Sequence, residues 1–433
     1  MIHRPLRRNI LGLCAAATAL LSAGAALAQT GYVRAGRLVD TIAGRVLDDQ
    51  LIHFVDGRVV SVAPFQSAPT DAPVTDWSAY TVLPGLIDMH THLVGGDQGA
   101  HVADPLLTSA AEDVLYGVRN ARLTLRAGFT TVRDVGTWRA LGDVALRDAI
   151  NAGRVEGPRM SVAGAYITVP GGGGEITGLA PDVVIPEEMR RGVVTNDNDV
   201  RLRAGWLFQR HVDFLKLIVT GAVLTVGTEP GQMELSEEQI RIAVQEAAIR
   251  HSFVAAHAHG AEGIKAAVRA GVRTIEHGSL IDDEGIAMMR TRPVWLVADI
   301  YNGDYIEEIG TRDGWPAETL RKNRETTDAQ REGFRRAVAA GVKIAYGTDS
   351  GVYPQGQNGR QFPNMVRYGM TPMQAIQSAT SVAAEAMMWS DDVGALAPGR
   401  YADMIAVEGD PLADIAVLMD VKAVIKGGEL VTP

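Results

Sequence analysis

Two histidines, His90 and His92, follow directly on residues 83–89, a mostly apolar segment that is typical of a buried strand. On a β-strand, alternate side chains point to the same side, so the two imidazoles would project together from the strand's end. Converging imidazoles suit a divalent metal of the zinc class. Two unrelated surface histidines would show the same spacing, so a metal site here requires further ligands elsewhere in the chain.

Lys216 is the only charged residue in the apolar run 214–219. Its side chain could extend to water or pair with a carboxylate. Alternatively, its amine could react with CO₂ to form a carbamate, which would replace a buried cation by an anion able to bridge two metals. The residues around Lys216 do not distinguish these interpretations.

Three more candidates, His257, His277 and Asp349, stand at the ends of predicted strands. Taken singly, each histidine is more simply a buried structural residue. His257 and His277 are, however, 20 residues apart, which is the length of one helix-plus-loop crossover between neighbouring parallel strands. The whole set therefore indicates a metal centre far more specifically than any single residue does. The set is His90, His92, Lys216, His257, His277 and Asp349.

The elements that must position these residues alternate between strands and helices. Helical patterns at 261–270 and 317–340 each end at a glycine, which is typical of a left-handed C-terminal cap. Arg133 and Asp134, at the end of the second strand, could pair with each other. Eight strands with intervening helices predict a (β/α)₈ TIM barrel, with its site at the carboxyl ends of the strands. The predicted strands are 82–89, 129–134, 159–166, 213–219, 253–257, 273–277, 294–298 and 342–347, and further helical patterns cover 106–127 and 236–250.

A small β-sandwich is predicted from both ends of the chain. Asp56 and Gly57, between two short apolar runs, indicate a hairpin turn. Residues 402–407 and 421–425 are expected to pair with residues 32–83. The predicted domains are a signal peptide (1–28), the N-terminal part of the sandwich (29–83), the barrel (84–388) and the C-terminal part of the sandwich (389–433).

The first 28 residues have the features of a signal peptide. An arginine-containing start precedes an apolar core at 10–21 and a small-residue cleavage site at 26–28. We expect export to the periplasm or the medium, by the general or the twin-arginine route. Cys14 is the only cysteine and would be removed, so the mature chain would have no disulfide and no thiolate ligand.

Composition limits the partners that we expect. The chain of 433 residues has a formal net charge of -10, which argues against nucleic acid. No membrane contact is expected after signal removal, because the apolar core is shorter than the roughly 20 residues of a membrane span. The extensive surface of a barrel favours a homo-oligomer, and the expected partner at the site is a small molecule.

Several motifs together resemble the amidohydrolase superfamily: PGLIDMHTH at 84–92, the lone Lys216, HAHG at 257–260, IEHG at 275–278 and GTDSG at 347–351. The resemblance covers nearly the whole chain after the signal segment. It is greatest to the imidazolonepropionase-related branch, which includes Xaa-Pro dipeptidases, other carboxypeptidase-like dipeptidases and ochratoxin-hydrolysing amidases.

The resemblance implies a binuclear zinc site. His90, His92 and Asp349 would hold the more buried metal, His257 and His277 the more exposed one, and N6-carboxylated Lys216 would bridge them. Two such metals acidify a water molecule and polarise the scissile carbonyl. Asp349 would be the general base that passes the proton to the leaving nitrogen.

The glycine-rich loop 171–174 departs from related sequences, which often have GGHG with a histidine that contacts the substrate. Gly173 occupies that histidine's position here, which would make the pocket roomier. His259 could polarise the carbonyl in its place or support the site structurally. Tyr166 and Arg360, on expected rim loops, are candidates for binding a substrate carboxylate.

The predicted function is metal-dependent hydrolysis of an amide C–N bond. N-acyl amino acids or dipeptides that release a C-terminal amino acid are the expected substrates, and ochratoxin A, cleaved to phenylalanine and ochratoxin alpha, is one candidate. A cyclic amidase or lactonase could use the same metals, and a deaminase could use one of them. Outside the enzymes, a periplasmic binding protein that has lost turnover is the alternative.

Overall fold

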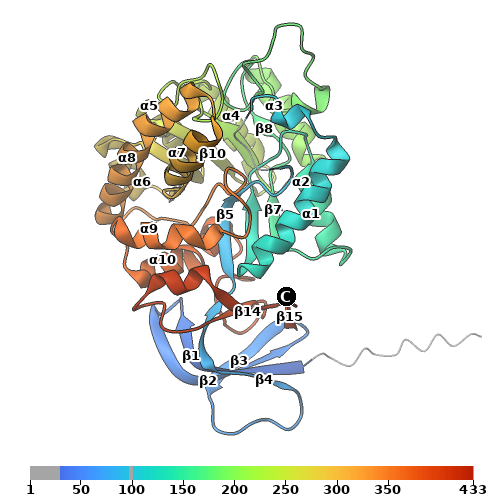
Figure 1. Ribbon diagram of the computed structural model, residues 1–433, viewed down its shortest axis with the longest axis vertical. Helices are drawn as coiled ribbons and strands as arrows, with labels where there is room; N and C mark the ends of the chain where they lie inside the picture. Colours follow the sequence, from blue (N-terminus) through green and yellow to red (C-terminus); the bar gives the residue numbers. More distant parts are fainter. Residues whose placement is uncertain (1–29, 97–100, 433) are drawn as a thin grey trace, which may run out of the picture.

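The computed structural model describes residues 30–96 and 101–432, and shows a helix–strand body above a separate β unit (Figure 1). The predicted signal peptide 1–28, with Cys14, lies outside the described residues. Across the described ranges, the helices are all too short or too polar to cross a membrane.

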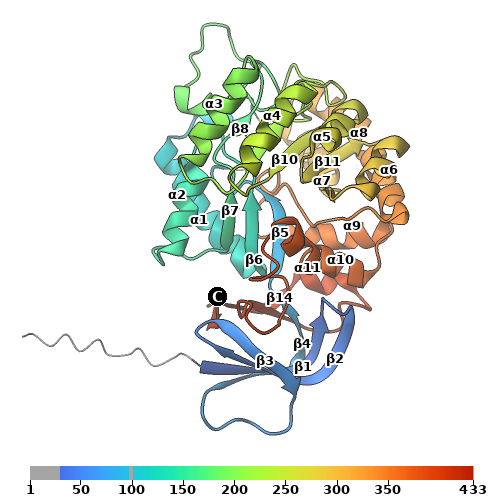
Figure 2. The ribbon, with the colours of Figure 1, turned by 180° about the vertical axis from the view of Figure 1, so that it is seen from behind.

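The β unit combines both ends of the chain, as predicted (Figures 1 and 2). Its seven strands form one sheet in the order β15-β14-β13-β4-β1-β2-β3. The central contact is the antiparallel pairing of β4 with β13, in which Leu83 lies opposite Ile405. The strands are β1 (Thr30–Asp40), β2 (Arg45–Val55), β3 (Arg58–Pro64), β4 (Val74–Pro84), β13 (Met404–Val407), β14 (Val421–Lys426) and β15 (Glu429–Leu430).

The sheet folds over on itself, which produces the sandwich-like unit. At the predicted turn, Asp56 and Gly57 both have positive φ, as a two-residue hairpin turn between β2 and β3 requires. The edge strand β3 then meets the segment that leads into β13, because the Val59 N–H donates to the Arg400 carbonyl (2.8 Å). An apolar core is enclosed, which includes Val33, Ile52, Phe54, Trp77, Val82 and Met404.

The barrel strands above it are parallel. The predicted strand 82–89 is divided between β4 and β5. A Cβ at the intervening Gly85 would lie 2.1 Å from Thr130 Oγ1, so only glycine fits where the chain passes from the sheet into the barrel. The barrel strands are β5 (Leu86–Thr91), β6 (Phe129–Asp134), β7 (Arg159–Val162), β8 (Tyr166–Ile167), β9 (Leu215–Ile218), β10 (Val254–Gly260), β11 (Thr274–Leu280) and β12 (Trp295–Val297).

Two predicted barrel strands are less regular than expected. The third, 159–166, is interrupted at Gly164, which has positive φ, so β7 pairs with β6 while β8 pairs with β9. The eighth, 342–347, forms no continuous ladder, because the Tyr346 N–H donates to Ser378 O (2.9 Å) and not to a neighbouring strand. Ala345 N–H donates to Leu296 O (3.0 Å), and Met89 N–H donates to Tyr346 O (2.8 Å). This segment closes the barrel between β12 and β5.

The helices follow local signals in the sequence. Gly271 and Gly341 adopt the left-handed conformation after α5 and α8, as predicted. The predicted helix 106–127 begins later, because Ser109 forms a capping box with Glu112. The helices are α1 (Ala110–Arg126), α2 (Gly142–Asn151), α3 (Asp197–Phe208), α4 (Glu237–Ala248), α5 (Ala261–Ala270), α6 (Asp283–Thr291), α7 (Asn302–Asp313), α8 (Ala317–Ala340), α9 (Gln361–Arg367), α10 (Pro372–Ser378) and α11 (Ser381–Ala386).

The β unit and the barrel are joined by a shared apolar core, to which Ile405 of β13 and Phe129 of β6 both belong. We expect Ile405→Ala to lower the free energy of unfolding by about 2–5 kcal/mol, because Ile405 is fully buried and truncation leaves a cavity. Denaturant titration measures the change. The matched control, Ile42→Ala at a 58% exposed position, should change it by no more than about 0.5 kcal/mol. Equal effects would contradict this role of Ile405.

Candidate metal centre

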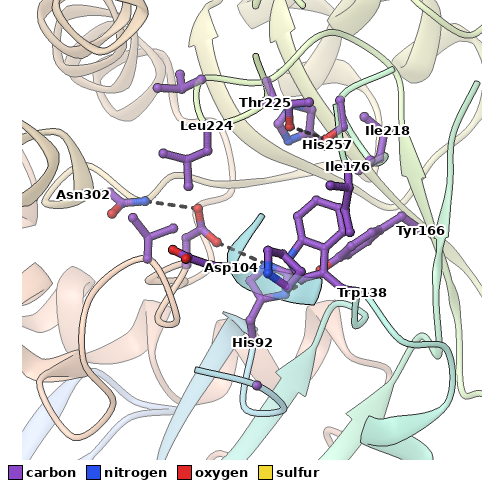
Figure 3. Close-up of a pocket in the computed structure, with 18 of the residues that line it drawn as sticks. His92, Asp104, Trp138, Tyr166, Ile176, Ile218, Leu224, Thr225, His257 and Asn302 are labelled. Atoms are coloured by element: carbon purple, nitrogen blue, oxygen red, sulfur yellow. Dashed lines mark hydrogen bonds and ion pairs between the residues drawn. The ribbon is translucent and has the colours of Figure 1, made fainter. Parts of the chain in front are cut away.

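All six predicted ligands line one cavity of about 400 Å³ at the carboxyl ends of the barrel strands. Figure 3 shows two of them, His92 and His257. They come from β5 and the residue directly after it, from β9, β10 and β11, and from the loop after the eighth predicted strand. Residues more than 250 positions apart in the sequence are thus brought together by closure of the barrel. The set is His90, His92, Lys216, His257, His277 and Asp349.

His90 and His92 direct the same nitrogen toward Asp349. The Nε2 atoms lie 3.4 Å and 3.3 Å from Asp349 Oδ1. Their Nδ1 atoms are already engaged, with Glu276 Oε2 (2.8 Å) and with the Gly136 carbonyl (2.9 Å). Because both of these partners accept hydrogen bonds, each Nδ1 carries the proton and each Nε2 keeps a lone pair for a metal.

His257 and His277 form a second pair, with ring centroids 4.6 Å apart. His277 Nδ1 is held by Asp299 Oδ1 (2.9 Å), and His257 Nε2 is held by the Gly221 carbonyl (3.2 Å). Each ring again has one nitrogen engaged and the other available. Two groups of three residues, which share His277, each bring their possible ligand atoms within 4.8 Å of one another. The first group is His90, His277 and Asp349, and the second is His257, His259 and His277.

Backbone conformation turns His277 into this cluster. His277 follows Glu276 on β11, and successive residues of a regular strand point to opposite sides. Here His277 has φ of 68°, in the left-handed region that β-carbons disfavour, so both side chains reach the barrel interior. Asp349 has a similarly unusual φ of 56°. Strain of this kind is concentrated where side-chain placement matters for function.

Lys216 has the environment that carbamate formation needs. Its side chain is buried at the cavity, where the carboxylates of Glu276 and Asp349 and the guanidinium of Arg133 act on its charge. Burial lowers the pKa of Lys216 to about 8, against the opposing effect of Glu276, which makes the neutral, nucleophilic amine accessible. Burial, together with neighbouring positive charge, also lowers the pKa of His90 and His257, which keeps both rings neutral for metal binding.

Arg133 supports the centre from below, and its predicted pairing with Asp134 is wrong. The two are consecutive on β6 and so point to opposite sides. Arg133 Nη2 donates to both oxygens of Glu276 (2.7 Å each), whereas Asp134 accepts from the Leu93 N–H (2.7 Å). Because Glu276 in turn holds His90, Arg133 fixes a ligand that it does not touch.

Besides Glu276, the residues at the centre that were missed in the sequence include Asp299, Asn302 and Gln330. Asp299 accepts from His277 Nδ1 and from Gln330 Nε2 (2.9 Å each). Burial would raise the pKa of Asp299, but His277 and Asn302 outweigh it and lower the pKa, so Asp299 remains an ionised acceptor. An acid directly after the seventh predicted strand was a usable signal, whereas Asn302 and Gln330 lie within helices and had none.

The residues proposed for substrate binding fall into two groups. Gly173, His259 and Tyr166 line the cavity, whereas Arg360 is not among its lining residues. Arg360 is exposed and donates to Tyr301 Oη (3.1 Å).

Each of the three lining residues is held by a neighbour. Gly173 N–H donates to Glu234 (2.9 Å), and a Cβ there would lie 3.1 Å from Ile218 and Ala222, so these neighbours would have to move by a few tenths of an ångström to admit a side chain. The Tyr166 hydroxyl donates to the Gly136 carbonyl (3.1 Å) and lies 3.2 Å from His92 Nδ1. His259 Nδ1 lies 2.8 Å from Ser279 Oγ.

The rest of the cavity wall is largely apolar. Figure 3 shows Trp138, Ile176 and Ile218 on one side and Leu224 across from them. Arg139 brings a guanidinium to the wall, but it already pairs with Asp113 (3.3 Å) and Glu188 (2.8 Å). The wall therefore favours a substrate with substantial apolar surface.

Comparison with known proteins agrees with this geometry. A model described as the amidohydrolase family matches residues 81–431. The chain belongs to the amidohydrolase family. The family resemblance predicted from the motifs is confirmed, and so are the barrel architecture and the class of enzyme, a hydrolase of amide bonds. A binding protein without turnover is correspondingly disfavoured.

Three relatives place the protein within the predicted branch of the family. Ochratoxinase of Aspergillus niger is 30% identical over 414 residues, which cover 90% of this chain and 82% of that protein. The crystal structure of a Xaa-Pro dipeptidase with methionine bound in its active site superposes with a TM-score of 0.87 at 34% identity, covering 93% of this chain and all of that one. A prolidase complexed with N-methylphosphonate-L-proline superposes with a TM-score of 0.86 at 28% identity, over 93% and 99% of the two chains.

The buried pair of Arg133 and Glu276 can be tested separately from the ligands. Both side chains are fully buried, so Arg133→Met leaves the Glu276 carboxylate without its counter-charge. We expect the free energy of unfolding to fall by about 3–5 kcal/mol, measured by denaturant titration. As the control, Arg312→Met removes an ion pair with Asp313 whose side chains are 66% and 41% exposed, and should cause no measurable change. A stable Arg133→Met variant would contradict this role.

Proposed function

We propose that the protein is an exported binuclear zinc hydrolase that cleaves the amide C–N bond of N-acyl amino acids or dipeptides and releases a C-terminal amino acid. One observation carries the proposal: four imidazoles, each with one nitrogen engaged and one available, converge with Asp349 and the buried Lys216 in a mostly apolar cavity. The names of the relatives, an ochratoxinase, a Xaa-Pro dipeptidase and a prolidase, support this substrate class.

The donor set fits two zinc ions. His90, His92 and Asp349 would hold one, His257 and His277 the other, and carboxylated Lys216 would supply the bridging anion. Bound zinc would supply a Lewis acid for the scissile carbonyl and a water molecule of lowered pKa. Nitrogen and oxygen ligands without thiolate agree with the absence of cysteine after residue 14.

The chain's own residues would perform the proton transfer. Asp349 takes the proton of the attacking water and delivers it to the amide nitrogen as the C–N bond breaks, so that one amide and one water become a carboxylic acid and an amine. His259, with Nδ1 held by Ser279, can offer its other nitrogen to the substrate carbonyl. Trp138, Ile176 and Leu224 bind the apolar part of the substrate and exclude water.

One observation favours a second candidate, a cyclic amidase or lactonase on the same metals. The Arg139 guanidinium at the cavity wall already pairs with Asp113 and Glu188, and Arg360 lies away from the wall. A substrate carboxylate would therefore have to displace a carboxylate from Arg139. A cyclic substrate without a free carboxylate would need no such exchange.

Release of amino acid from a panel of N-acyl amino acids, X-Pro dipeptides and ochratoxin A tests the proposed function. We expect zinc-loaded wild-type protein to cleave at least one of them, and Lys216→Ala to lose activity by at least about 100-fold because the bridging anion is absent. Chelation should abolish the activity and added zinc should restore it.

Two outcomes of the panel would overturn parts of the proposal. If no member of the panel is cleaved, but cyclic imides or lactones assayed beside it are, the substrate class is wrong and the second candidate is favoured. Equal activity of Lys216→Ala and wild type would show that Lys216 does not bridge metals.

Export can be tested independently of catalysis. We expect the protein recovered from the periplasm or medium to begin at Gln29, as determined by mass spectrometry of the intact chain, because the small-residue site at 26–28 precedes it. A full-length chain retained in the cytoplasm would contradict export.

Sedimentation of the mature protein would test the expected homo-oligomer. Two exposed apolar side chains near the start of α1, Leu107 and Leu115, favour such an assembly.

A further inference from the structure

Asn302, the first residue of α7, connects two carboxylates at the metal centre. Its Nδ2 donates to Asp299 Oδ2 and to Asp349 Oδ2, at 3.1 Å in each case. The side chain is buried and lines the cavity. A primary amide has two N–H donors, and here each is directed at a different carboxylate.

The chemistry of the partners sets the orientation of this amide. Carboxylate oxygens accept hydrogen bonds, so the NH₂ group must face Asp299 and Asp349, whereas the opposite orientation would place three acceptors together. The Asn302 Oδ1 atom is buried and has no hydrogen-bond partner among the described residues. The two carboxylates, not a partner of Oδ1, therefore determine how Asn302 is placed.

Asp299 is itself a fixed anchor for Asn302. Its Oδ1 accepts from His277 Nδ1 and from Gln330 Nε2 of α8, which leaves Oδ2 for Asn302. A continuous chain of hydrogen bonds thus runs from His277 through Asp299 and Asn302 to Asp349. It joins a proposed ligand of one metal to a proposed ligand of the other, outside the metals themselves.

The two oxygens of Asp349 consequently have different surroundings. Oδ1 lies 3.4 Å and 3.3 Å from the Nε2 atoms of His90 and His92, whereas Oδ2 accepts from Asn302. Without the amide, the carboxylate could rotate about its terminal torsion, which is broad for aspartate. A base held in one orientation transfers protons more effectively than one that must first rotate into place.

We propose that Asn302 is a positioning residue for Asp349: its amide fixes the carboxylate plane with Oδ1 toward the metal ligands, and anchors that orientation on Asp299 and His277. The expected effect on kcat rests on the proposed hydrolase function, whereas the orientation of the Asp349 carboxylate by Asn302 does not depend on it. Asn302 should therefore affect kcat more than KM, because it orients the base and does not bind the substrate.

Two variants separate donation from packing. Asn302→Asp keeps the shape of the side chain but replaces the double donor by a third carboxylate, and Asn302→Leu removes both donors at similar volume. We expect each to lower kcat by about 10–100-fold with KM changed less than threefold and with the zinc content of wild type. In the cobalt-substituted protein, the visible absorption bands should change in both variants, because the coordination by Asp349 is altered.

Asn120→Leu is the matched control, since Asn120 is another buried asparagine whose Nδ2 donates to two groups, the carbonyls of Leu93 and Gly95. Its cobalt spectrum should match wild type. Wild-type kcat and spectrum in Asn302→Asp would overturn the proposal, and so would loss of zinc that accounts for the whole loss of activity. If wild type cleaves no substrate of the panel, the proposed function fails, while the cobalt spectra still decide the role of Asn302.

Discussion

The buried ion pair between Arg133 and Glu276 is the interaction on which the rest of the metal centre depends. Both side chains are fully buried, so neither charge is stable in the barrel interior without the other. Glu276 also accepts from His90 Nδ1, and thereby sets which nitrogen of that ring faces the centre. Arg133 thus holds the Glu276 carboxylate, and Glu276 in turn determines which nitrogen of His90 carries the proton.

The same arrangement recurs around the other histidines. Asp299 holds His277, the Gly136 carbonyl holds His92, and the Gly221 carbonyl holds His257. Each acceptor comes from a different strand or loop than the ring that it orients. Such partners fix the tautomer and the direction of each imidazole before any metal arrives, which reduces the reorganisation required on binding. The rigidity of the barrel makes this preorganisation possible, because the acceptors belong to hydrogen-bonded strands or to the loops directly after them.

Much of the fold could be predicted because its signals are local. Glycines after α5 and α8 and the Asp56-Gly57 turn act within a few residues, and all are found where expected. The predictions failed where contact with a distant segment decides the outcome. A predicted strand divides at Gly85, whose N–H donates to Asp403 O beside β13, whereas the next N–H, of Leu86, donates to Gly128 O in the barrel. The eighth strand is irregular because the Tyr346 N–H donates to Ser378 O and not to a neighbouring strand.

The sequence by itself determined the chemical types at the centre and the order in which the strands present them. Motif spacing is enough for this, because each parallel strand of a barrel delivers its last residues to the same rim. Only the tertiary structure decided which atoms face one another. The left-handed backbone at His277, the pairing of Arg133 with Glu276 and not with its neighbour Asp134, and the link from Asp299 through Asn302 to Asp349 all depend on side chains far apart in sequence. Linear spacing does not specify such contacts, since they arise only when the barrel closes and every buried polar group must find a partner.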